Sequence, residues 1–104
     1  MTAGDRLLAT LAALDNPHRL RIIGALQTGG RNYVSQLARE IGISRPLLHL
    51  HLNKLEEAGL VTSRLELSQD GKALNYFEVS AFRLELTPSS IAQAATSLTS
   101  KAEK

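Results

Sequence analysis

Apolar and polar positions alternate with the period of an α-helix through the first half of the chain. The first apolar stripe consists of Leu7, Leu11 and Leu14, with Leu8 beside it. Asn16 and Pro17 are suited to cap and begin a second helix, which we expect to reach about Gln27 before Gly29-Gly30 ends it. The residues expected to face inward on this second helix are Leu20, Ile23 and Leu26.

Two further helices follow in close succession. The first starts near Asn32 and has its apolar positions at Val34, Leu37, Ala38 and Ile41. Gly42 ends it, and Ser44 and Pro46 supply the cap and first turn of the next helix, over residues 44–57. The buried face of that helix is formed by Leu48, Leu52 and Leu55, and Gly59 ends it. So tight a connection between helices predicts a helix-turn-helix over about 33–57.

Beyond Gly59 the period changes to two, which predicts strands. The first strand carries Val61, Ser63, Leu65 and Leu67 on one face, a turn follows at 68–72, and a second alternating run at 75–79 completes a hairpin over about 61–79. Phe82, Leu84 and Leu86 fit either another strand or an extended connector. Thr87-Pro88 begins a last helix, over about 88–100. The predicted fold class is therefore α+β and mainly α.

Length and composition support one folded domain spanning residues 1–104. Hydrophobic residues make up 43% and charged residues 21%, which excludes a disordered chain. The chain has no cysteine, so a disulfide framework, a thiolate zinc site and a cysteine nucleophile are excluded. No apolar run is long enough to span a membrane, and the N-terminus lacks the pattern of a secretion signal. We therefore expect a cytoplasmic protein.

Three passages of the chain resemble the ArsR family of winged helix-turn-helix regulators. LDNPHRLRIIGAL (14–26) is similar to the opening of that family, and VSQLAREIGISRPLLHLHLNKLEEAGLV (34–61) is similar to its helix-turn-helix. The hairpin at 64–79, with Gly71-Lys72 near its tip, resembles the wing. The resemblance implies a winged helix-turn-helix that binds double-stranded DNA, flanked by N- and C-terminal helices that form a dimer interface.

The metal sites of the family are missing from this sequence. The thiolate site of the family falls on residues 32–37, which here contain neither cysteine nor histidine. Its other common site uses histidines and carboxylates of the last helix, but residues 88–104 contain no histidine and Glu103 is their one carboxylate side chain. We therefore expect no metal and no cofactor, and the resemblance carries over the fold and DNA binding without metal sensing.

A helix that buries Leu48, Leu52 and Leu55 presents the opposite face to its surroundings, where it fits the major groove of DNA. Arg45 is suited to guanine, Asn53 to adenine or phosphate, and His49 to either of them. Lys54 is expected to meet a phosphate, while Leu47 and Leu50 could pack on thymine methyl groups. The full predicted DNA-binding set is Ser44, Arg45, Leu47, His49, Leu50, Asn53, Lys54, Arg31, Arg64, Gln69 and Lys72.

The other members of that set carry alternative interpretations. Arg31, Arg64 and Lys72 could each hold a phosphate, and Gln69 could reach the minor groove from the tip of the wing. Leu47 and Leu50 could instead pack on a neighbouring helix or on a partner protein. Among the remaining polar residues, we expect His51 at the edge of the core and His18 in solvent. Arg19 and Arg21 are expected to face solvent or to pair with Asp15.

The first and last helices carry apolar stripes that we expect another surface to bury. We expect them to form a homodimer interface from Leu7, Leu11, Leu14, Ile91, Ala94, Ala95 and Leu98. The resulting prediction is a sequence-specific homodimeric repressor, with no catalytic motif for an enzyme. The alternatives are a winged-helix protein-interaction module, which the net charge of only +2 slightly favours, or a nonspecific architectural DNA binder. An organic effector bound near the dimer helices is also compatible with the sequence, although no group of polar residues indicates which molecule it would be.

Overall fold

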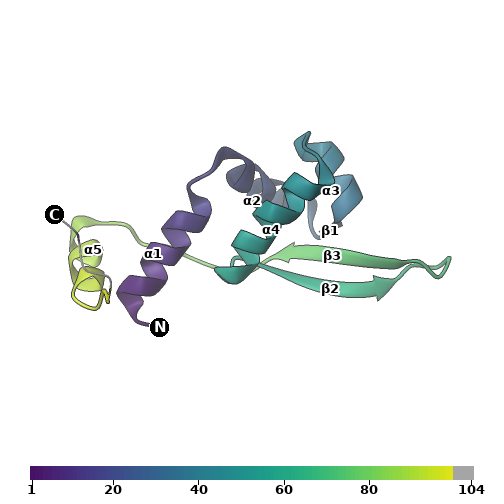
Figure 1. Ribbon diagram of the computed structural model, residues 1–104. Helices are drawn as coiled ribbons and strands as arrows, with labels where there is room; N and C mark the ends of the chain where they lie inside the picture. The colour runs from purple at the N-terminus through teal and green to yellow at the C-terminus, as the bar shows by residue number, and fades with distance from the viewer. Residues whose placement is uncertain (100–104) are drawn as a thin grey trace.

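The computed structural model describes residues 1–99 and shows an elongated shape with extents of 54 × 23 × 22 Å. Its helices are α1 (Ala3–Leu14), α2 (Pro17–Gly29), α3 (Val34–Ile41), α4 (Arg45–Glu57) and α5 (Pro88–Ala95), and its strands are β1 (Asn32–Tyr33), β2 (Val61–Leu67) and β3 (Ala73–Val79). Figure 1 shows α2, α3 and α4 at the centre, α1 and α5 at one end, and the β2–β3 hairpin at the other. The arrangement is mainly helical with one small sheet, as predicted.

Local capping explains where the central helices begin. The Oδ1 of Asn16 accepts hydrogen bonds from the backbone N–H groups of His18 (2.8 Å) and Arg19 (3.3 Å), which satisfies two donors at the start of α2. The Oγ of Ser44 accepts from the N–H of Leu47 at the start of α4. Between α3 and α4, Gly42 adopts φ +84° and donates its N–H to the carbonyl of Ala38, which ends α3 with a left-handed residue.

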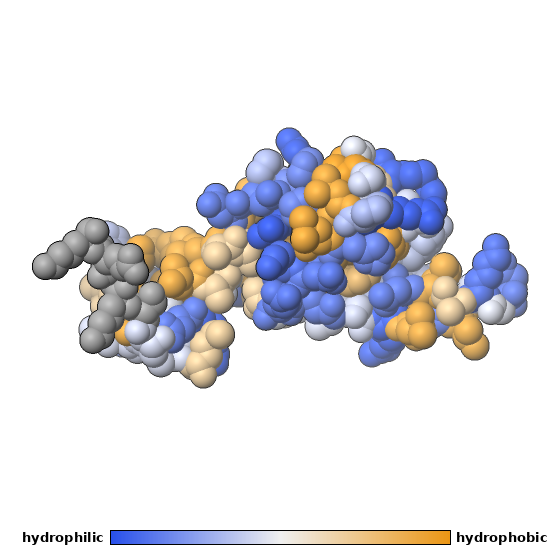
Figure 2. All heavy atoms as spheres, in the orientation of Figure 1, coloured by the Kyte–Doolittle hydropathy of each residue, from blue (hydrophilic) through white to orange (hydrophobic). Residues whose placement is uncertain are grey.

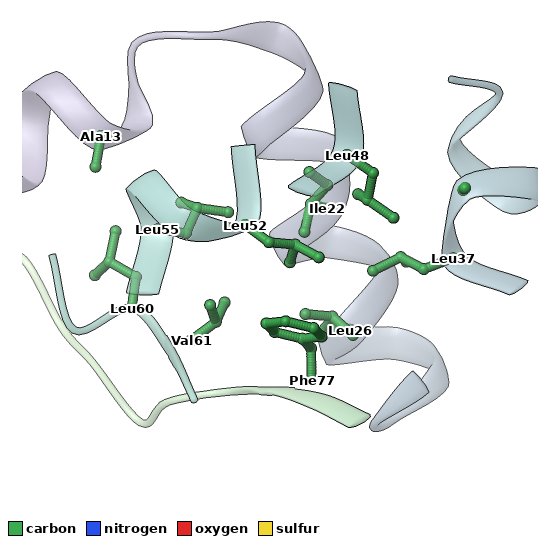
Figure 3. Packing of buried hydrophobic residues seen from close by; sticks show 11 residues of the cluster. Ala13, Ile22, Leu26, Leu37, Leu48, Leu52, Leu55, Leu60, Val61 and Phe77 are labelled. Carbon is green, nitrogen blue, oxygen red and sulfur yellow. The ribbon is translucent and has the colours of Figure 1, made fainter. Parts of the chain in front are cut away.

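The core lies where α2, α3 and α4 pack against the sheet (Figure 3). The side chains of Leu48, Leu52 and Leu55 are fully buried, as their spacing predicts. Burial of one such leucine contributes about 1.5–3 kcal/mol to the free energy of folding, so this stripe holds α4 firmly against the rest of the body. The other residues of the cluster are Ala13, Ile22, Leu26, Leu37, Ala38, Leu60, Val61 and Phe77.

The inward face of α2 differs from the prediction. Leu20 is 57% exposed, whereas Ile22 is fully buried. Ile22 and Leu26 are four residues apart and point into the core together, as Figure 3 shows. At 100° per residue Leu20 lies about 160° from Ile22, on the opposite side of the helix. The prediction that Leu20, Ile23 and Leu26 face inward was therefore wrong for Leu20. Several residues of α2 are apolar, and only the tertiary packing selects which of them are buried.

The sheet is antiparallel with strand order β1-β3-β2. The hairpin pairs Val61 with Val79 at one end and Leu67 with Ala73 at the other, which confirms the predicted hairpin. β1 was not predicted, because a strand of two residues has no periodicity; its Tyr33 pairs with Tyr76 of β3. As a result α3 begins at Val34 and not near Asn32.

The chain returns from the hairpin to α1 through an extended connector. Residues 80–87 form no strand, so the second of the two predicted alternatives is correct. α5 begins at Pro88 with a capping box between Thr87 and Ser90, and it ends at Ala95, earlier than the predicted 88–100. Residue 100 lies outside the described residues.

Candidate nucleic-acid interface

The outward face of α4 is centred on Pro46, Leu50 and Asn53, and Arg45 and His49 lie along one flank of it. All five side chains are exposed, and so are Ser44, Leu47 and Lys54, as predicted. They are exposed because Leu48, Leu52 and Leu55 occupy the opposite face and anchor the helix in the core. The N-terminus of a helix carries a partial positive charge, which adds to the charge of Arg45 and favours a phosphate or an electronegative base edge nearby.

The two flanks of α4 meet different parts of the molecule. On one flank, Arg45 and His49 line a cleft of about 270 Å³ between the start of α3 and the free edge of β3 at Ala73–Asn75. On the other flank, Lys54 lines a separate cleft against α1 and α2. Arg45 and His49 therefore lie beside the β2–β3 hairpin, which we call the wing, whereas Lys54 lies on the opposite flank of the helix.

Arg31 contacts other side chains of the same subunit. Its guanidinium forms an ion pair with the carboxylate of Glu66 and lies 4.4 Å from the centre of the Tyr76 ring. The hydrogen bond from Arg31 lowers the pKa of Glu66, and the same contact raises the pKa of Arg31. Both side chains remain partly exposed, so water screens the pair and a phosphate could compete for Arg31.

Arg64 lies beside Arg31 in a hollow that also includes Tyr76. Strand residues alternate between the two faces of a sheet, and Val61 points into the core that α4 covers. Arg64 is three positions from Val61 and therefore lies on the other face. The structure thus separates Arg31 and Arg64 from the outward face of α4.

The tip of the wing presents Gln69 and Lys72 to solvent. The Nζ of Lys72 is 4.0 Å from the carboxylate of Asp70, with both side chains largely exposed. A hydrogen bond from the hydroxyl of Ser68 lowers the pKa of Asp70. The tip therefore carries a carboxylate next to its lysine, which reduces the net positive charge that the wing offers to DNA.

Two leucines of the wing are exposed, a feature the sequence interpretation missed. Leu65 is 69% and Leu67 76% exposed, although they continue the alternation that begins at buried Val61. Figure 2 shows hydrophobic side chains on the part of the hairpin that extends beyond the body. Alternation predicts the face of a strand, but it cannot indicate that the sheet extends past the helices that cover this face.

A buried polar contact joins α2 to α4 behind the outward face. The Nε of Arg19 donates to the Nδ1 of His51 at 3.1 Å, and His51 is only 4% exposed. Burial, followed by the nearby charge of Arg19 and the ring of His18, lowers the pKa of His51 below its ordinary 6.5. The predicted place of His51 at the core edge is thus confirmed.

The predictions for His18 and Arg19 were wrong, whereas Arg21 is exposed as predicted. His18 is half-buried, with its ring 5.4 Å from that of His51 between centroids. The Nδ1 of His18 has no hydrogen-bond partner within residues 1–99. Arg19 is half-buried, and among the ion pairs of residues 1–99 none joins it to Asp15. A position in the first turn of a helix looks exposed in the sequence, but the packing of α4 against α2 covers His18.

α1 and α5 together form an apolar groove of about 150 Å³. We call it the α1–α5 groove, and its residues are Gly4, Leu7, Leu8, Leu11, Ile91, Ala94, Ala95 and Leu98. Six of the seven predicted interface residues line it; the exception is Leu14, which packs against the core instead. Leu14 lies at the C-terminal end of α1, where the helix joins the body.

Small residues and polar contacts hold α5 against α1. A Cβ added to Gly4 would lie 2.2 Å from the carbonyl oxygen of Ala94, so the two helices touch through their backbones. The N–H of Gly4 donates to the Oγ of Ser97 at 2.8 Å. The N–H and hydroxyl of Thr99 both donate to the carboxylate of Asp5, and these bonds lower its pKa.

Residues 1–99 contain neither a cluster of metal-binding side chains nor a helix that could span a membrane. No group of three or more histidine, aspartate or glutamate side chains is placed to hold a metal ion. In the same residues no helix has both the length and the apolar character needed to cross a membrane.

Comparison with known proteins assigns the family. Residues 14–64 match the model of a helix-turn-helix domain. A protein of Methanocaldococcus jannaschii, described as an uncharacterized HTH-type transcriptional regulator, is 38% identical over 71 residues, which cover 68% of this chain and 73% of the relative. The chain belongs to the helix-turn-helix transcriptional regulators. This regulator is therefore a DNA-binding protein, as the outward face of α4 and the wing indicate.

Solved structures support the fold of the regulator. NolR of Sinorhizobium fredii is similar with a TM-score of 0.62 and 27% identity, over 88% of this chain and 79% of NolR. An ArsR family transcriptional regulator is similar with a TM-score of 0.57 and 21% identity, over 88% of this chain and 80% of the other. The regulator thus has the winged-helix fold that its resemblance to the ArsR family implies.

Proposed function

We propose that the regulator is a homodimeric repressor that reads double-stranded DNA in the major groove with α4. The wing contacts the flanking backbone or minor groove. The observation that carries this proposal is the outward face of α4, where Arg45, His49 and Asn53 are exposed on a helix whose other side is locked into the core. The whole chain acts as one domain that binds DNA and catalyses no reaction.

A dimer supplies the number of phosphate contacts that one subunit lacks. A single subunit offers few cations for phosphates, since Arg31 is paired with Glu66 and Lys72 lies next to Asp70. Two copies double the number of phosphate contacts, and affinity for DNA depends steeply on that number. A two-fold axis places the two α4 helices about one DNA turn, or roughly 34–36 Å, apart, so the operator is palindromic. Repression follows when the bound dimer blocks polymerase.

Fluorescence anisotropy tests the proposal with the DNA upstream of the protein's own gene, a scrambled duplex and a salt series. We expect tighter binding to the native duplex and a salt slope that corresponds to several phosphates. Arg45→Ala should weaken binding to the native duplex by about 5- to 150-fold, the equivalent of about 1–3 kcal/mol for a bidentate base contact. Arg21→Ala is the matched control, because Arg21 is an exposed arginine that belongs to α2 and not to α4.

The alternative function, a protein-interaction module, has its own supporting observation. Leu50 on α4 is 52% exposed, and Leu65 and Leu67 of the wing are more exposed still. An Arg45→Ala/Lys54→Ala double variant distinguishes the two functions. A DNA reader loses affinity and shows a shallower salt dependence, whereas equal behaviour of the double variant and the wild type would favour the interaction module. If the native duplex fails to bind, selection from random DNA sequences decides whether another operator exists.

A further inference from the structure

A cleft of about 470 Å³ lies between α1, α2 and α4, on the flank of α4 that faces away from the wing. Alanines of α1 line one of its walls, and Arg19, Lys54 and Glu57 contribute its polar groups. The α1–α5 groove, by contrast, has only apolar side chains and a glycine. The cleft between α1, α2 and α4 therefore differs from the groove in having two cations and one carboxylate, with which a charged small molecule could bind.

Hydrogen bonds within the protein fix the guanidinium of Arg19 in a position where it could bind an anion. Its Nε donates to the Nδ1 of His51, and its Nη1 lies 3.4 Å from the carbonyl oxygens of both Ala12 and Ala13 at the end of α1. A guanidinium has five N–H donors, and for the two on Nη2 no partner is found within residues 1–99. Because the side chain is already ordered, a ligand that bonds to Nη2 loses little further conformational entropy.

The charges in the cleft define the class of ligand. Lys54 and Glu57 are three residues apart on α4 and therefore lie on the same side of the helix. Neither they nor Arg19 take part in an ion pair in the described part of the chain. Two cations and one carboxylate leave a formal charge of +1, which matches a ligand with a single negative charge. A ligand with two carboxylates would bring its second one close to Glu57.

We propose that this cleft binds a small monocarboxylate. The carboxylate bonds to Nη2 of Arg19 and to Nζ of Lys54, and a short apolar chain packs on the alanines of α1. Glu57 rejects dicarboxylates by charge repulsion.

Calorimetric titration and thermal unfolding of the full chain test this site without DNA, at constant ionic strength. The probes are butanoate, succinate and the neutral analogue butanamide. We expect saturable binding of butanoate with a concentration-dependent rise in Tm, and no effect of butanamide. Lys54→Gln and Arg19→Lys should each weaken butanoate by about tenfold, since each removes a charge-assisted or forked contact. Arg21→Lys is the control and should bind like the wild type.

Glu57→Gln gives an independent readout of selectivity. We expect this variant to bind succinate better than the wild type does, by about tenfold, and so to lose the preference for one carboxylate. Equal Tm shifts for butanoate and sodium chloride, or butanoate binding that Lys54→Gln leaves unchanged, would overturn the proposal. If Arg19→Lys does not fold, the Lys54 and Glu57 variants still decide. Because these titrations contain no DNA, their failure is distinguishable from failure of the proposed operator binding.

Discussion

At the scale of single residues, His51 combines burial with a hydrogen bond that its neutral ring accepts. Its Nδ1 accepts a hydrogen bond from Arg19, so the proton of the neutral ring is on Nε2. Protonation would place a second positive charge against Arg19 inside the protein. The groups that face the ring are Arg19 and His18, both of α2. The sequence placed His51 at the core edge, but this partner is 32 residues away in the chain.

This arrangement predicts a specific dependence of stability on pH. The folded pKa of His51 is lower than its ordinary 6.5, so the unfolded chain binds a proton first as the pH falls. The contribution to the free energy of unfolding is therefore complete above about pH 6.5 and declines below it, by at most about 1.36 kcal/mol per pH unit. His51→Asn, whose Oδ1 can still accept from Arg19, should show a flatter profile from pH 7 to 5.

Urea unfolding at a series of pH values measures this effect. His49→Asn is the matched control, because His49 is an exposed histidine of the same helix. It should keep the wild-type slope between pH 7 and 5. An unchanged slope in His51→Asn would show that another group causes the pH dependence.

At the scale of elements, the contact between α1 and α5 depends on one glycine. Gly4 lets the backbones of the two helices touch, and the Gly4–Ser97 and Asp5–Thr99 hydrogen bonds surround the contact. α5 has no buried residue of its own, so few contacts hold it in the monomer. The position of α5 therefore depends on close approach to α1 more than on hydrophobic burial.

Gly4→Ala should release α5 from α1. The added Cβ would lie 2.2 Å from the carbonyl oxygen of Ala94, and a backbone atom cannot move aside as a side-chain end can. We expect the free energy that holds α5 against α1 to fall by about 1–3 kcal/mol, which would be seen as faster hydrogen exchange of the amides of α5. Gly24→Ala is the control, because its Cβ would meet nothing within 4 Å; it should stabilise α2 by up to about 1 kcal/mol. Equal exchange rates in both variants would contradict the role of Gly4.

At the scale of the whole molecule, the groove and the DNA face lie at different places on an elongated chain. Figure 1 shows α1 and α5 at the end opposite the wing, with α4 between them. A second copy seated on the α1–α5 groove would therefore leave α4 and the wing of each subunit accessible. Exposed apolar side chains in the groove, among them Leu8 at 52% and Ile91 at 47%, give such a copy a surface to cover.

Leu8→Glu should convert the proposed dimer into a monomer. A carboxylate in the groove would be desolvated against apolar side chains of the partner, a cost of several kcal/mol that the interface cannot offset. Sedimentation velocity at micromolar concentration should show a dimer for the wild type and a monomer for this variant. Leu67→Glu changes an exposed leucine of the wing and should remain dimeric. A monomeric wild type would rule out this interface.

The sequence by itself determined the local elements of the regulator. The leucine stripe of α4, the caps at Asn16 and Ser44, and the alternation of the hairpin depend on interactions within a few residues, and all of them were predicted. The outward face of α4 followed as well, since a helix that buries one known stripe must expose the opposite face. Periodicity and capping are short-range effects, so the sequence displays them directly.

Only the tertiary structure decided how these elements meet. The partners of Arg31, Arg19 and Gly4 are 35, 32 and 93 residues away, and no local pattern indicates such pairs. The same holds for the buried side of α2 and for the part of the wing that no helix covers. These features depend on which surfaces pack together, because several faces of similar hydropathy compete and the fold as a whole selects among them.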